Sequence, residues 1–145
     1  MNQAALDEKR IAQIREIFTR VPYAHFIGLE LGEIKSGEAT IHLKVRDDFK
    51  QNQGVVHGGV IASVIDTASA FAVVTQLEQG ERVTTTDLTI HYLRPVTKGE
   101  IRAAGPNCTQ RPAPVRHFCG SLGQSTSPNC HSGDRLYKAE INRAT

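Results

Sequence analysis

The stretch NQGVVHGGVIASVIDTASAF, residues 52–71, opens with His-Gly-Gly and continues into an apolar run. From Gly58 to about Leu77, apolar side chains recur every three to four residues, and the remaining face is also mostly small or apolar. This pattern predicts a helix that is covered on nearly all sides, the central helix of a domain. Asp66 is the only Asp, Glu, Lys or Arg between Lys50 and Glu78. A lone carboxylate in an apolar run costs free energy unless it is paired or has a function.

Patterns on both sides of this helix predict strands. Residues 26–34 and 38–45 flank a Ser-Gly turn, and the second run alternates apolar and polar side chains. Such a pair is typical of a β-hairpin with one buried face. After the helix, residues 82–95 form a long β-rich run, and a further strand is predicted to begin in residues 98–105.

The N-terminal region predicts a helix of its own. Residues 5–20 place isoleucines and a phenylalanine at helical spacing between charges, so an amphipathic helix is expected within residues 1–21, closed by Pro22. With no linker or internal repeat visible, residues 1–145 are predicted to form a single α+β domain with a mostly antiparallel sheet and one buried helix.

Composition argues against several classes of protein. A net charge of +2 without a basic run disfavours nucleic-acid binding. The N-terminus begins polar and charged, unlike a signal peptide, and polar side chains interrupt the apolar residues 54–77, which argues against a membrane span. A cytoplasmic protein is therefore expected. The three cysteines lack the short Cys-x-x-Cys spacing of structural zinc sites, so free thiols are favoured over a metal site that would include His117 and His131.

The start of the predicted helix is a candidate binding site. Its first N–H groups lack helical partners and carry the positive end of the helix dipole, which suits a phosphate or an oxyanion. Gly58 and Gly59 would let a ligand approach the backbone closely, although they could equally serve tight packing. Asp66 follows Gly58 by eight residues, about 12 Å along a helix. The two positions are then either unrelated, with Asp66 a satisfied buried carboxylate, or brought together by the antiparallel helix of a second subunit.

Two segments taken together resemble one family. Residues 51–73 combine Gly-x-x-His-Gly-Gly with an apolar helix that carries Asp seven positions after the second glycine. Residues 84–103 hold Thr-x-Asp-Leu-x-Ile-x-Tyr-Leu-Arg-Pro followed by Gly-Glu. The combination resembles the PaaI-like branch of the hotdog-fold thioesterases, over residues 22–105. The resemblance implies the hotdog fold, in which an antiparallel sheet wraps one long central helix, and hydrolysis of an acyl-coenzyme A thioester.

The resemblance also implies roles for particular residues. Asp66 would be the nucleophile or the general base that activates water, and the Gly58 amide of the partner subunit would hold the thioester carbonyl. His57 would support the loop and the carbonyl site, and Thr85 would orient the water or Asp66. Active sites would lie between the subunits of a homodimer, often paired into a homotetramer, with no metal or bound cofactor.

Further positions are candidates by the same resemblance. The family often has Asn six residues before the histidine, where this chain has Gln51 with Asn52 beside it, and either amide could take that role. Apart from the resemblance, Gly59, Arg94 and Lys98 are candidate contacts for coenzyme A; the two cations could meet its phosphates, although scattered surface charges are more often solvated.

Two alternatives to a thioesterase stay open. A hotdog protein could bind acyl-coenzyme A as a sensor or carrier without cleaving it, and a hotdog hydratase, which uses a different Asp and His motif, is less favoured. Residues 106–133 depart from the family, because they hold four of the six prolines and all three cysteines. We predict mostly loop there, with a short strand around Val115–Leu122 and another in residues 135–141. Our hypothesis for this segment is a stretch of altered reading frame.

Overall fold

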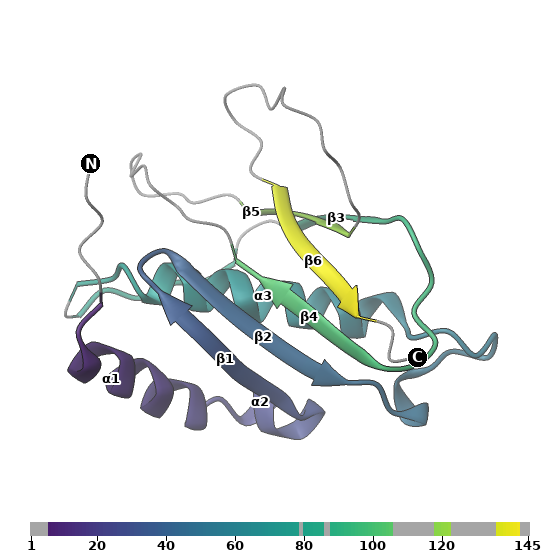
Figure 1. The fold of residues 1–145 in the computed structure, drawn as a ribbon, viewed down its shortest axis with the longest axis horizontal. Coiled ribbons are helices and arrows are strands. Elements are labelled where there is room, and N and C mark those ends of the chain that lie inside the picture. Colours follow the sequence, from purple (N-terminus) through teal and green to yellow (C-terminus); the bar gives the residue numbers. More distant parts are fainter. Residues whose placement is uncertain (1–5, 79, 86–87, 106–117, 123–135, 143–145) are drawn as a thin grey trace.

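The computed structural model describes residues 6–78, 80–85, 88–105, 118–122 and 136–142. Within these ranges, a six-stranded sheet packs along one long helix, and two shorter helices contact its first strand (Figure 1). In chain order the elements are α1 (Glu8–Thr19), α2 (Pro22–Ile27), β1 (Leu29–Lys35), β2 (Glu38–Lys44), a 3₁₀ turn (Asp47–Phe49), α3 (Gly58–Val74), β3 (Leu88–Tyr92), β4 (Glu100–Ala104), β5 (Phe118–Leu122) and β6 (Leu136–Asn142). The predicted α+β class is confirmed. A single domain over 1–145 stays a prediction.

The N-terminal region forms two helices rather than one. Helix α1 begins after Asp7, whose carboxylate accepts a hydrogen bond from the Arg10 backbone N–H at 2.7 Å and so caps the helix. The predicted role of Pro22 as a helix terminator is wrong, because α1 already ends at Thr19 and Pro22 is the first residue of α2. Proline suits that position since the first helical residue needs no N–H donor.

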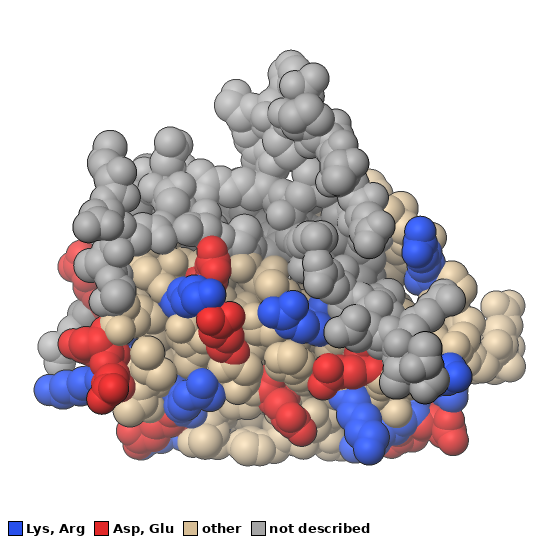
Figure 2. All heavy atoms as spheres, in the orientation of Figure 1, with Lys and Arg blue, Asp and Glu red and all other residues tan. Residues whose placement is uncertain are grey.

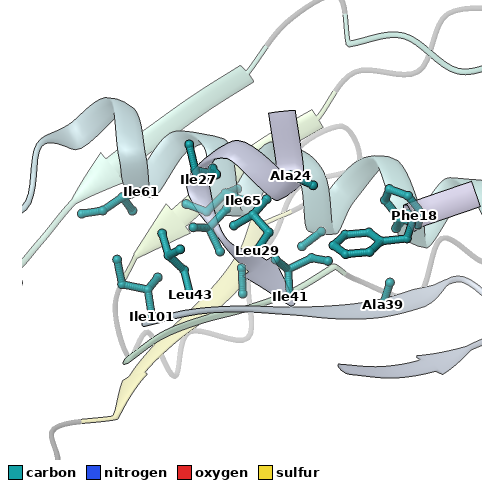
Figure 3. Packing of buried hydrophobic residues seen from close by; sticks show 14 of the residues in the cluster. Phe18, Ala24, Ile27, Leu29, Ala39, Ile41, Leu43, Ile61, Ile65 and Ile101 are labelled. Carbon is teal, nitrogen blue, oxygen red and sulfur yellow. The ribbon is translucent and has the colours of Figure 1, made fainter. Parts of the chain in front are cut away.

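The predicted hairpin is confirmed. Strands β1 and β2 pair antiparallel across Ser36 and Gly37, and Gly37 has a φ of 76°, which glycine adopts without strain. Ala39, Ile41 and Leu43 of β2 alternate along the strand and are buried. The hairpin therefore supplies one wall of the hydrophobic core (Figure 3).

Helix α3 provides the opposite wall of this core. It packs on β2 and β4, and Ile61, Val64 and Ile65 are among its buried side chains. Figure 3 shows Ile61 and Ile65 in this core. The helix ends at Val74, a turn earlier than predicted. The sheet approaches α3 closely after β4, because a Cβ on Gly105 would lie 2.6 Å from the carbonyl oxygen of Ala68. Only glycine fits this position.

One face of α3 is open in the single chain. Ala62, Ser63, Asp66, Thr67 and Ala70 lie on that face and are only partly buried. The prediction of a helix covered on nearly all sides is therefore wrong for this face. One sheet can cover only one side of a helix, and the described residues leave the side that carries Asp66 accessible.

The sheet has the strand order β1-β2-β4-β6-β5-β3. The pairs β1–β2, β2–β4 and β4–β6 are antiparallel, as predicted, whereas β5 pairs parallel with both β3 and β6. The β-rich run over 82–95 contributes only β3 as strand, and Val83, Thr84 and Thr85 lie outside it. The predicted strands near 115–122 and 135–141 correspond to β5 and β6. The rest of the atypical segment lies outside the described residues, and with it Cys108, His117, Cys130 and His131, which were considered for zinc.

The charged surface is mixed. On the face drawn in Figure 2, acidic and basic side chains of the described residues are interspersed. Among those residues, no helix combines the length and apolar character that crossing a membrane would require. No group of three or more His, Cys, Asp and Glu side chains in the described part of the chain could hold a metal ion. The absence of a nucleic-acid partner stays a prediction.

Candidate active site

The loop before α3 sets the first helical residue at Gly58. The backbone N–H of His57 donates to the carbonyl of Phe49 at 2.8 Å, and Lys50 and Val56 form an antiparallel bridge. His57 then caps the helix, since its Nδ1 accepts a hydrogen bond from the Gly59 N–H at 3.0 Å. An Nδ1 that accepts must be unprotonated, so the ring proton of a neutral His57 sits on Nε2.

The cap leaves one backbone donor available. The Gly59 N–H is bonded to the His57 ring, and the Val60 N–H donates to the His57 carbonyl at 3.0 Å. The Gly58 N–H has no hydrogen-bond partner among the described residues. A helix N-terminal amide of this kind can stabilise an oxyanion, because it is fixed in place and lies at the positive end of the helix dipole. The contact to His57 also removes Gly59 as a backbone donor to coenzyme A.

A cavity of about 280 Å³ opens beside this amide. Its polar lining comes from Gln51, Gly58, Tyr92 and Arg94. The apolar lining residues are Val55, Val56, Ile61, Leu93, Pro95 and Val96. Of the two candidate amides in the loop, Gln51 lines the cavity and Asn52 does not, and Lys98 likewise lies outside the lining.

Tyr92 is a cavity residue to which the sequence pattern assigned no role. Its hydroxyl donates a hydrogen bond to the Gly58 carbonyl oxygen at 3.0 Å. Its ring covers Gly58, because a Cβ added there would lie 3.3 Å from the ring atom Cζ. Burial raises the pKa of Tyr92, which keeps the hydroxyl in its donating form. Tyr92 belongs to the Tyr-Leu-Arg-Pro motif, but its contact with Gly58 could not be predicted from the sequence because it depends on the fold.

The second group of candidate residues lies further along α3. Asp66 is partly buried, and its Oδ1 accepts a hydrogen bond from the Thr85 hydroxyl at 2.5 Å. Among the described residues no other hydrogen bond to this carboxylate is found, so Oδ2 is available. This bond orients the carboxylate, which is one of the two roles that the resemblance implied for Thr85; the other, orienting the water, stays a prediction.

The two groups do not meet within one chain. Gly58 and Asp66 occupy the same helix eight positions apart, about 12 Å along its axis. Asp66 is also absent from the lining of the cavity beside Gly58. Within one chain, the Gly58 amide and the Asp66 carboxylate therefore lie at separate places on α3.

Comparison with known proteins identifies the family. The Thioesterase superfamily matches residues 53–110. A protein of Saccharolobus solfataricus, provisionally named an esterase, is 30% identical over 99 residues, which cover 68% of this chain and 70% of the relative. A second protein of that organism, also provisionally named an esterase, is 27% identical and matched over 59% of its length. The chain belongs to the thioesterase superfamily.

Solved structures agree with this assignment. The Escherichia coli PaaI protein, from the phenylacetic acid degradation operon, is 25% identical with a TM-score of 0.61, over 68% of this chain and 70% of that one. A thioesterase from Haemophilus influenzae is 25% identical with a TM-score of 0.57, over 64% of both chains. The sheet and central helix are those of a PaaI-like hotdog protein, as the resemblance implied. The family supports thioester hydrolysis as the general activity.

Proposed function

We propose that this protein hydrolyses an acyl-coenzyme A thioester to the free acid and coenzyme A. The oriented carboxylate of Asp66 is the observation that carries the proposal. Thr85 holds one carboxylate oxygen, and the other has no hydrogen-bond partner in the part of the chain that the structure describes. The available Gly58 amide, with Gln51 and Arg94 around the adjoining cavity, supports a site for the thioester carbonyl and its coenzyme A portion.

In the proposed reaction, Asp66 acts as a general base or as a nucleophile. As a base, it takes a proton from a water molecule whose oxygen bonds to the thioester carbon, and the carbonyl electrons move to oxygen. The Gly58 N–H then stabilises this oxyanion. When the carbonyl re-forms, the C–S bond breaks and the sulfur leaves as thiolate, which takes up a proton. As a nucleophile, Asp66 would first form an acyl anhydride with loss of the thiolate, and water would then release the acid.

We propose that the complete site is formed by two chains. The spacing of Gly58 and Asp66 prevents one chain from presenting both groups to the same carbonyl. The open face of α3 carries Asp66 together with small side chains, which allow a second α3 to approach closely in antiparallel direction. A homodimer would then contain two equivalent sites, and a homotetramer would contain four. A cytoplasmic location stays a prediction.

The test is a panel of acyl-coenzyme A thioesters with detection of the free thiol. Wild-type protein should release thiol, and Asp66→Asn, which is nearly isosteric, should be at least about 100-fold slower. Near wild-type turnover in Asp66→Asn would exclude the proposed role of this carboxylate. Binding of the panel without release of thiol by the wild type would instead favour the sensor or carrier.

A further inference from the structure

Tyr92 contacts the candidate carbonyl site in two ways. Its hydroxyl donates to the Gly58 carbonyl, and its ring lies against Gly58, where an added Cβ would be 3.3 Å from Cζ. Tyr92 is the last residue of β3, so the contact joins the edge of the sheet to the first residue of α3. The side chain is 50% exposed, so this contact contributes little to the core.

A donor on glycine needs restraint from its surroundings. Glycine has more backbone freedom than any other residue, and a free rotation at Gly58 would change the direction of its N–H. A donor stabilises an oxyanion best when its direction is fixed before the charge develops. His57 restrains the backbone after Gly58 through the Gly59 N–H, and the Tyr92 hydroxyl restrains the Gly58 carbonyl itself.

The same part of the chain restrains the other half of the site. Thr85 precedes β3 and bonds Asp66, whereas Tyr92 ends β3 and bonds Gly58. Asp66 and Gly58, the two positions of α3 that the proposed reaction uses, are thus both hydrogen-bonded by residues before or at the end of β3. Their relative placement depends on how β3 lies along α3.

We infer that Tyr92 is a positioning residue for the oxyanion donor, and that it acts through Gly58 rather than on the substrate. This inference rests on the proposed function. It assigns to the Tyr92 hydroxyl an effect on the transition state, where the Gly58 amide stabilises the charge that develops on the carbonyl oxygen of the substrate, and little effect on binding of the ground-state thioester.

The experiment compares Tyr92→Phe with a control, Thr19→Val. Each change deletes one exposed hydroxyl that donates to a backbone carbonyl, and the Thr19 hydroxyl donates to the Glu16 carbonyl at 2.7 Å within α1, away from Gly58. With an acyl-coenzyme A that the wild type cleaves, Tyr92→Phe should lower kcat about 3- to 10-fold and leave KM within about two-fold, as expected for one hydrogen bond used in the transition state. Thr19→Val should change neither constant by more than about two-fold. An unchanged kcat in folded Tyr92→Phe, or a loss confined to KM, would overturn the inference.

A spectroscopic measurement separates this role from general stability. In the Asp66→Asn background, bound benzoyl-coenzyme A should show its thioester carbonyl stretch at lower wavenumber than in water, because the Gly58 amide polarises the bond. Adding Tyr92→Phe should move the band back toward its position in water, and adding Thr19→Val should not. Identical bands with and without the Tyr92 hydroxyl would refute the positioning role. If the wild type cleaves no thioester, the proposed function fails, and the infrared band still decides whether Tyr92 orients the Gly58 amide.

Discussion

Mixing two inactive variants would show whether the site needs two chains. One variant, Asp66→Asn, lacks the carboxylate, and the other, Gly58→Pro, lacks the backbone donor. Proline fits this position because Gly58 is the first helical residue and His57 before it has a ψ of 135°, in the extended region that proline requires of its predecessor. Gly58→Ala is the matched control, since it adds a Cβ 3.3 Å from the Tyr92 ring but keeps the N–H.

The activity expected to return on mixing follows from how the two variants combine in a dimer. Alone, Gly58→Pro should lose about 100- to 1000-fold in kcat, and Asp66→Asn at least about 100-fold. After random exchange of equal amounts, about half of the dimers are hybrids. One site of each hybrid joins the intact carboxylate of one chain to the intact amide of the other, and its second site lacks both. About one quarter of all sites, and hence about one quarter of wild-type activity, should return.

The assay is thiol release from an acyl-coenzyme A, with hybrid formation followed by native mass spectrometry. A tetramer assembled from two such dimers gives the same fraction of intact sites. Full hybrid formation without recovered activity would refute a site shared between chains. Equal inactivation by Gly58→Ala and Gly58→Pro would refute the role of the N–H, because only proline removes it.

Four shorter predictions concern other parts of the molecule. Thr85→Val should lower kcat about 10-fold or more in the thiol assay, because it removes a hydrogen bond to a charged group, while Thr85→Ser should restore most of the loss. Arg10→Met should lower the free energy of unfolding by about 2 kcal/mol, measured with urea, because the guanidinium donates to the carbonyls of Val74, the last residue of α3, and of Leu77 beyond it. Arg20→Met, which removes only the exposed ion pair with Glu16, should lower this free energy by under about 0.5 kcal/mol. Burial raises the pKa of Tyr92 above the ordinary tyrosine value of about 10. The contribution of this side chain to stability is therefore present below about pH 10 and is lost as pH rises through its pKa in the folded protein. When urea unfolding is followed against pH, this alkaline loss of stability should be absent in Tyr92→Phe. For residues 106–133, translation of the coding DNA in the other two frames should give a proline-poor sequence rich in Val and Leu, and its absence in both frames would contradict an altered reading frame.

Much of the architecture follows from local sequence pattern. The hairpin and α3 were predictable because their apolar side chains repeat at the periods of strand and helix over enough residues to be unambiguous. The His-Gly-Gly stretch marked the start of α3 for the same reason, since glycine and a capping side chain stand where the apolar helical pattern begins. The contact between Thr85 and Asp66 could be predicted only from the family resemblance, because the two residues are 19 positions apart.

The remaining features depend on contacts between distant segments. Gln51 and Asn52 are adjacent amides that sequence alone could not separate, and the turn that places one of them at the cavity is set by bonds within the loop, from the Gln51 N–H to Val55 and from the Gly54 N–H to Gln51. The role of Pro22 was misjudged because proline both ends and begins helices, and only the position of the preceding helix end decides between them.

The open face of α3 is a feature that the sequence pattern alone could not predict. An apolar helix with one carboxylate is consistent with complete burial, and from pattern alone Asp66 could be a satisfied structural residue. The sheet covers the opposite side of α3, so Asp66 stays partly accessible among small side chains, two turns from the amide that it would need. A two-fold axis beside this face would place the Asp66 of each chain near the Gly58 of the other, with the spacing fixed by the rigid helices. In the proposed dimer, Thr85 and Tyr92 would orient the Asp66 carboxylate and the Gly58 backbone from within their own chain, before the two chains meet.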